Sequence, residues 1–136
     1  MPKVSMTTDL AASADEVWRL IGGFNALPDW HPAVEQSELT EEGQTRTLSL
    51  AGGGRIVEKL EAVDDGARTY SYTIDSGPLP VANYRAEITV REGENGCEVE
   101  WSSDFEAAGV PDNDAVKAIQ GVYQAGFDNL KKMFGG

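Results

Sequence analysis

The chain has 136 residues, of which 40% are hydrophobic and 25% charged. This composition excludes a fibrous or disordered protein and fits one domain spanning residues 1–136. Asp and Glu outnumber Lys and Arg by 23 to 11, which gives a formal net charge of −12. A surface of this charge repels phosphate backbones, so we expect no binding to nucleic acid.

The sequence also disfavours a protein that depends on disulfides or a metal site, and one that is secreted or spans a membrane. Cys97 is the single cysteine and His31 the single histidine, too few for an internal disulfide or a Cys/His metal site, so we expect no metal and no cofactor. The apolar runs are shorter than a signal peptide or a membrane span requires. We therefore expect a cytoplasmic protein that does not insert into membranes.

A strand and a helix are predicted first. Residues 3–10 alternate between apolar and polar side chains, which indicates a strand with one face toward a core. Ser13 and Glu16 have the spacing of a capping box at a helix start. The apolar residues that follow recur at helical spacing: Val17, Leu20, Ile21 and Phe24. A pair of glycines ends this helix, and the two prolines that follow leave room for at most one short second helix.

From Val34 to Phe105, alternation and turn signals predict six further strands. The turn signals are Gly52-Gly53-Gly54, Asp64-Asp65-Gly66, Gly77-Pro78-Leu79-Pro80 and Glu94-Asn95-Gly96. The last two strands each have one apolar and one charged face, a pattern typical of an antiparallel sheet with one face covered and the other in solvent.

After Pro111 the apolar period changes to about 3.6 residues, which predicts one amphipathic helix of roughly 22 residues, N-capped by Asp112 or Asn113. Its apolar positions are Val116, Ile119, Tyr123, Phe127, Leu130 and Phe134. Gly126 flanks this stripe, where it would permit close contact with the sheet or leave space for a ligand. Gly121 lies away from the stripe, and the pattern gives no reason for it.

This order of elements resembles the helix-grip fold, and the chain resembles the SRPBCC superfamily of START lipid-transfer domains and birch-pollen-allergen-like proteins. The likeness is greatest to bacterial polyketide cyclase/dehydrase-like proteins. The matching segments are 12–18, 27–32, 56–60 and 77–85. The resemblance implies an α+β fold, with a curved antiparallel sheet of about seven strands around a long C-terminal helix and two short helices between strands 1 and 2. It implies a cavity between sheet and helix, but no particular reaction.

The candidate ligand-binding residues are those expected to face this cavity. They are Trp30, His31, Arg46, Leu48, Glu58, Tyr72, Tyr84, Trp101, Gln120, Tyr123 and Phe127. The tyrosines favour a pocket over a dry core, because each buried hydroxyl must find a partner. For Phe127 an ordinary core position is the stronger alternative.

Three of these residues, His31, Glu58 and Arg46, are also candidates for catalysis. His31 is the simplest general base near neutral pH, with a hydrogen-bonded or exposed loop position as the alternative. Glu58 faces inward if Ile56 and Leu60 do, because side chains alternate along a strand. A register shifted by one residue would turn Glu58 outward, but it would bury two charged residues in its place.

Arg46 lies two and four residues before Leu48 and Leu50, so it faces inward with them if they do. We therefore expect Arg46 and Glu58 to form the polar part of the pocket. A three-residue hairpin loop, Gly52-Gly53-Gly54, would pair Leu48 with Glu58. Arg46 would then lie diagonal to Glu58, about 7–8 Å away between backbones. A ligand could bind between the two charges.

The function expected from these features is binding of a small apolar or aromatic ligand by a monomer or weak homodimer. A polyketide cyclase/dehydratase-like enzyme is one alternative, and it would need two polar groups that converge on one point of the cavity. A partner-binding module of the chaperone-associated kind is another, and it would show an exposed apolar patch.

Overall fold

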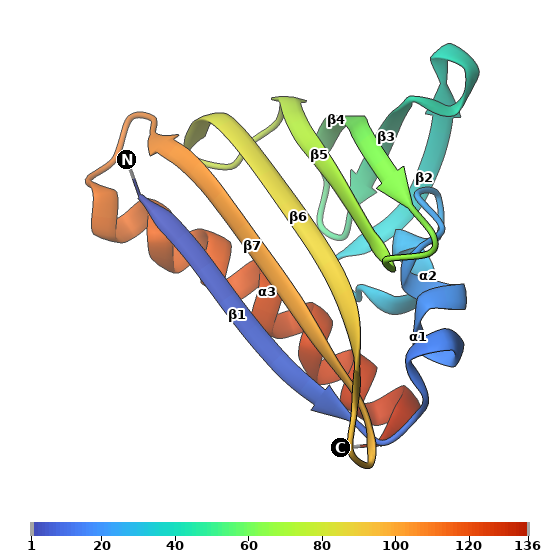
Figure 1. Ribbon diagram of the computed structural model, residues 1–136. Helices are drawn as coiled ribbons and strands as arrows, with labels where there is room; N and C mark the ends of the chain where they lie inside the picture. Colours follow the sequence, from blue (N-terminus) through green and yellow to red (C-terminus); the bar gives the residue numbers. More distant parts are fainter. Residues whose placement is uncertain (1, 136) are drawn as a thin grey trace.

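The computed structural model describes residues 2–135, in which seven strands form one antiparallel sheet around a long helix (Figure 1). The elements in chain order are β1 (Lys3–Leu10), α1 (Ala14–Ile21), α2 (Leu27–Trp30), β2 (Val34–Thr40), the 3-10 turn η1 (Glu41–Gly43), β3 (Thr45–Leu50), β4 (Arg55–Asp64), β5 (Thr69–Ser76), β6 (Val81–Gly93), β7 (Gly96–Ala107) and α3 (Asp112–Phe134). The predicted helix-grip fold is confirmed, including both short helices between the first two strands.

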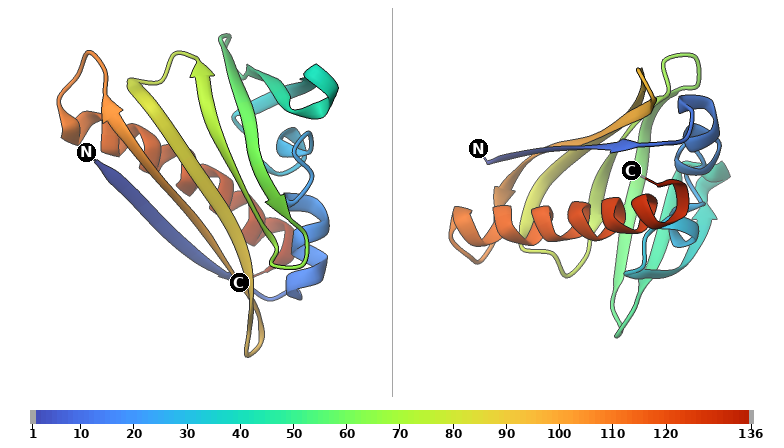
Figure 2. Two further views of the ribbon diagram at one scale, coloured as in Figure 1. Left: turned by 45° about the horizontal axis from the view of Figure 1, so that its top comes forward. Right: turned by 90° about the horizontal axis from the view of Figure 1, so that it is seen from below.

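The sheet has the strand order β1-β7-β6-β5-β4-β3-β2, so each strand from β2 to β6 pairs with the next along the chain. The first strand joins the far edge by pairing with β7. The sheet curves, and α3 runs along its inner side while α1 and α2 lie at one end (Figure 2). The space between sheet and helices is thus closed by elements from both ends of the sequence.

Alternation along the strands sorts apolar from charged residues as predicted. On β6 and β7 the inward positions Ile88, Val90 and Val99 are fully buried. On the outer face, Arg91 pairs with Glu98 and Glu100 of the neighbouring strand. The apolar stripe of α3 covers the inner face through Ala115, Ile119, Tyr123, Phe127 and Leu130. Hydrophobic burial therefore holds the long helix in the curve of the sheet.

The two longer helices begin differently. The Ser13 side chain accepts a hydrogen bond from the Glu16 N–H, as the capping-box spacing predicts. The N-cap of α3 is Pro111 and not Asp112 or Asn113, so that prediction was wrong by one or two residues. Pro111 has an extended backbone and no N–H to leave unpaired, and the acidic residues that follow lie in the first turn, where the helix dipole favours them.

The hairpin between β3 and β4 has a different register from the one predicted. Leu48 pairs with Ile56, and Arg46 lies directly opposite Glu58 instead of diagonal to it. Residues 51–54 connect the two strands, Ser49 and Arg55 are the last pair before the turn, and all three glycines of the turn have positive φ angles, from 85° to 102°. The pairing is shifted by two residues from the predicted one, which keeps Arg46, Leu48, Ile56 and Glu58 on the predicted inner face.

Gly126 lies where α3 meets α2 and β7. A Cβ atom at this position would be 2.9 Å from His31 Cδ2, 3.0 Å from Trp30 Cζ3 and 3.3 Å from Trp101 Cζ3. These rings are buried and cannot move away easily. The glycine therefore allows the short helix to approach the long one closely. Gly121 is exposed, with no atom within 4 Å of the same position.

We expect Gly126→Ala and Gly121→Ala to change stability in opposite directions. Alanine favours a helix over glycine by about 1 kcal/mol, and Gly121→Ala should gain up to that amount. At Gly126 overpacking should outweigh the gain, for a net loss of about 1–2 kcal/mol. Urea unfolding followed by circular dichroism measures both changes. Equal stabilisation by the two substitutions would contradict the close contact at Gly126.

Candidate functional site

A cavity of about 170 Å³ lies between the inner face of the sheet, α2 and α3. The residues that line it are Leu27, His31, Ala33, Val34, Leu48, Leu50, Ala51, Ile56, Glu58, Tyr72, Ile74, Leu79, Tyr84, Trp101, Ile119 and Val122. The walls are mainly aliphatic and aromatic, with Glu58 as the one carboxylate among these described residues. A cavity of about 150 Å³ engineered in another protein holds benzene, so this space fits one substituted ring.

The structure brings together six of the predicted ligand-binding residues at the cavity wall: His31, Leu48, Glu58, Tyr72, Tyr84 and Trp101. Four others, Trp30, Arg46, Tyr123 and Phe127, are buried behind the wall and do not line it. The prediction that Gln120 faces the cavity was wrong, because its side chain is exposed to solvent. It follows Ile119 by one residue, which turns it about 100° around the helix and away from the cavity.

Several lining residues were not among the predicted site residues. The alternation along the strands places Leu50, Ile56 and Ile74 on the inner face, and Ile119 lies on the apolar stripe of α3. The sequence therefore contained a signal for these four residues. Leu79 has no such signal, because it belongs to an irregular loop between β5 and β6.

Glu58 reaches the cavity from β4 and forms an ion pair with Arg46 on β3. Arg46 Nε donates to Glu58 Oε1 over 2.7 Å, and Arg46 Nη2 lies 2.6 Å from the same oxygen. The side chains are 1% and 6% exposed. Directly opposite positions on adjacent strands place the two side chains side by side on the inner face.

The Arg46 guanidinium is enclosed on its remaining sides. Its Nη1 donates to the Phe24 carbonyl over 2.6 Å, and its Cζ lies 4.1 Å from the centroid of the Phe24 ring. The Tyr72 and Tyr70 rings lie 5.2 Å and 5.9 Å from the same atom. Arg46 therefore does not contribute a ligand-facing donor, which corrects the expectation that a ligand binds between the two charges. Its two contacts with Oε1 fix the position of the Glu58 carboxylate on the side away from the cavity.

The environment acts on the pKa values of both partners. Burial raises the pKa of Glu58 overall, although the charge and hydrogen bond of Arg46 oppose that effect. Burial lowers the pKa of Arg46, but the charge and hydrogen bond of Glu58, together with the nearby Tyr70 and Tyr72 hydroxyls, raise that pKa overall. A carboxyl oxygen that accepts two bonds from a permanent cation is best satisfied when ionised, so the two groups form an ion pair without net charge.

Aromatic hydroxyls provide the remaining polar surface of the site. Trp101 Nε1 donates to the Tyr72 hydroxyl over 3.0 Å, and the hydroxyls of Tyr84 and Tyr123 are hydrogen-bonded to each other. Burial raises the pKa values of Tyr72 and Tyr84 well above the ordinary phenol value. These groups are therefore neutral phenols that bond with one another, and not bases.

His31 connects the end of α2 to the long helix. Its Nδ1 accepts from the Ala33 N–H over 3.2 Å, which assigns the ring proton to Nε2, and Nε2 lies 2.7 Å from the Val122 carbonyl oxygen. Burial lowers the pKa of His31, although the Val122 bond works in the other direction. Because both ring nitrogens are engaged, His31 serves better as a neutral tie between α2 and α3 than as a general base.

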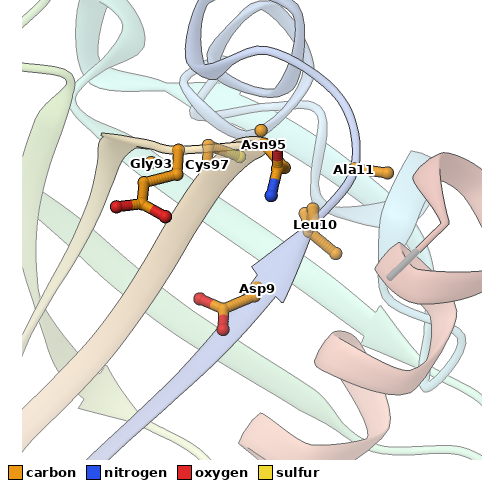
Figure 3. Close-up of a pocket in the computed structure, with 8 residues that line it drawn as sticks. Asp9, Leu10, Ala11, Gly93, Asn95 and Cys97 are labelled. Carbon is orange, nitrogen blue, oxygen red and sulfur yellow. The ribbon is translucent and has the colours of Figure 1, made fainter.

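A second depression, of about 510 Å³, borders the cavity and shares four lining residues with it: Ile56, Ile74, Leu79 and Tyr84. Another, of about 410 Å³, lies where β1 ends against the turn between β6 and β7, with Asp9 on the strand and Asn95 in the turn (Figure 3). At least half of the residues that line each of these depressions are exposed. The smaller cavity has the more apolar wall and includes the buried carboxylate of Glu58, so it is the better candidate for a small-molecule site.

Two features are absent from residues 2–135. No group of three or more His, Cys, Asp or Glu side chains is placed to hold a metal ion. Within the same residues, every helix is too short or too polar to span a bilayer.

We expect the stability of the protein to fall on mild acidification because of His31. Its pKa in the folded state lies below the ordinary value of about 6.5, so the unfolded chain takes up the proton first as the pH falls. The free energy of unfolding should drop between about pH 7 and pH 5, by at most about 1.4 kcal/mol per pH unit. Urea unfolding measures this slope, and His31→Gln should flatten it. Equal slopes in both proteins would contradict a buried neutral histidine.

Comparisons with known proteins agree with this geometry. Residues 1–135 match the family described as polyketide cyclase / dehydrase and lipid transport. The protein XoxI from Bacillus cereus is 40% identical, with a TM-score of 0.96 over 98% of this chain and 96% of that one. An uncharacterized protein from Bacillus thuringiensis is also 40% identical, with a TM-score of 0.95 over 98% of both chains. The search among curated proteins gave no match.

A more distant likeness extends the fold to an enzyme. The Zhui aromatase/cyclase from a Streptomyces is 19% identical, with a TM-score of 0.78 over 97% of this chain and 92% of that one. At this identity the likeness shows the fold alone. The match over residues 1–135 establishes the family: the chain belongs to the polyketide cyclase / dehydrase and lipid transport family, and its sheet and long helix have the START-like arrangement.

Proposed function

We propose that the protein binds a small apolar or aromatic molecule in the cavity between the sheet and α3. The observation that carries this proposal is an apolar space of about 170 Å³ with one buried carboxylate, Glu58, at its wall. Apolar walls supply affinity, and one fixed polar group supplies orientation.

The cyclase/dehydratase-like alternative is less well supported by the residues at the wall. Proton transfer on a substrate needs an acid and a base within reach of the reacting atoms. The His31 nitrogens are both engaged, and the tyrosine pKa values are raised, which leaves Glu58 without an evident second catalytic group. A binding role requires only the cavity.

A partner-binding module is also less well supported. Among the described residues, the large hydrophobic side chains that are exposed come from four separate places, β2, β4, the loop before α3 and the end of α3. They are Leu39, Val63, Val110 and Met133. Isolated exposed hydrophobic residues are ordinary on soluble proteins and do not indicate a docking surface.

Filling the cavity should abolish binding of a small aromatic probe. We expect p-cresol to shift the amide resonances of the cavity residues in a nuclear magnetic resonance titration of the wild-type protein. Leu48→Phe adds bulk at a buried lining position and should remove these shifts. Leu39→Phe makes the same change at an exposed position of β2 that does not line the cavity, and should leave binding intact.

The stability of each variant is checked by thermal unfolding. If Leu48→Phe proves unstable, Ile119→Phe fills the space from the α3 side instead. The proposal is wrong if p-cresol shifts no cavity resonance in the wild-type protein, or if the filled variants bind it as well as the wild type.

A further inference from the structure

The wall of the cavity carries a charge that is already balanced. Glu58 faces the cavity, and Arg46 lies directly behind it at 2.6–2.7 Å. Both Arg46 contacts end on Oε1, so Oε2 keeps its lone pairs for another donor. The guanidinium is fixed by the Phe24 carbonyl and the surrounding rings, which prevents it from swinging into the cavity.

A balanced pair treats ligands differently from an isolated carboxylate. A ligand cation would be attracted by Glu58 but repelled by Arg46 close behind it, so little attraction remains to offset its loss of hydration. A ligand anion would face the carboxylate first and would also lose its hydration. A neutral group that donates a hydrogen bond is not repelled by either charge and does not lose the hydration of an ion, and it still meets a charged acceptor.

The other polar groups at the wall are less available to a ligand. The Tyr72 hydroxyl accepts from Trp101 Nε1, and the Tyr84 hydroxyl bonds with that of Tyr123. Because a carboxylate is a stronger acceptor than a hydroxyl, Glu58 Oε2 is the strongest acceptor that a ligand can meet at the described wall. The faces of the cavity are aromatic and aliphatic and suit a ring.

Building on the proposed function, we propose that the cavity selects an electrically neutral ring that carries one hydrogen-bond donor, such as a simple phenol. The donor bonds with Glu58 Oε2 and the ring fills the apolar space. Arg46 acts as a positioning residue that sets this preference by cancelling the charge of Glu58. Ligands of the same size that carry an ammonium or a carboxylate group are excluded.

The test is a titration of the wild-type protein with four ligands built on one methyl-substituted ring, each followed by nuclear magnetic resonance. p-Cresol and p-xylene are nearly equal in shape and differ in the donor, while 4-methylbenzylamine adds a cation and 4-methylbenzoate an anion. We expect p-cresol to bind about tenfold more tightly than p-xylene, because a polar site left unpaired penalises the analogue without the hydroxyl. The two ions should show no saturable binding at the cavity.

Changing the charge of the wall should change the selection. Glu58→Gln leaves Arg46 unbalanced, so 4-methylbenzoate should gain affinity and p-cresol should lose it. The double variant Arg46→Gln with Glu58→Gln has a neutral wall again and should exclude both ions. Glu61→Gln is the matched control, because it removes the same charge from an exposed position on the same strand and should leave the ligand order unchanged.

The outcomes separate this inference from the proposed function. If neither p-cresol nor p-xylene binds, the proposed function itself fails. If the neutral ligands bind but p-cresol has no advantage, or if either ion binds as tightly as p-cresol, the proposed function stands and the selection for a neutral donor is wrong. The wild-type ligand order decides the matter even if Glu58→Gln does not fold.

Discussion

A guanidinium group buried to 1% exposure must have its charge compensated, and much of the structure around the cavity follows from how Arg46 meets this need. Glu58 supplies the opposite charge, the Phe24 carbonyl accepts a further N–H, and aromatic rings cover its faces. These groups come from β4, β5 and the connection between α1 and α2. One side chain thereby joins the middle of the sheet to the segment that closes its end.

The same ion pair adds little to stability by itself. Desolvation of two buried charges commonly cancels their attraction, and well-packed apolar residues often serve stability as well or better. Its position at the wall of an otherwise apolar cavity fits the proposed recognition of a ligand. The pair gives the protein a strong hydrogen-bond acceptor at a place where an isolated carboxylate would be too costly to bury.

The sequence predicted the fold and the inward faces well, because both depend on local periodicity. Glu58 and Arg46 were placed on the inner face by parity alone, and parity is unaffected by a register shift of two residues. The register itself was wrong, because a run of three glycines is compatible with turns of different length. The predicted position of Gln120 at the cavity was wrong for a related reason. An apolar stripe shows which side of a helix is buried, but it does not decide whether a residue next to the stripe faces the cavity.

Other features of the site depend on contacts between distant segments, which periodicity does not describe. The enclosure of Arg46 by Phe24 joins residues 22 positions apart, and the bond from His31 to Val122 joins residues 91 positions apart. No local pattern distinguishes a buried arginine that faces a ligand from one that supports the residue in front of it. The three-dimensional structure assigns these roles.

The close contact at Gly126 also bears on how this sequence can diverge. Residue 126 shares one small volume with the rings of Trp30 and His31, which come from a segment about 95 positions earlier in the chain. Substitutions at these positions are therefore not independent, and their energetic effects should not add. A related chain with a side chain at position 126 needs a smaller residue at position 30 or 31, so the three positions are expected to covary.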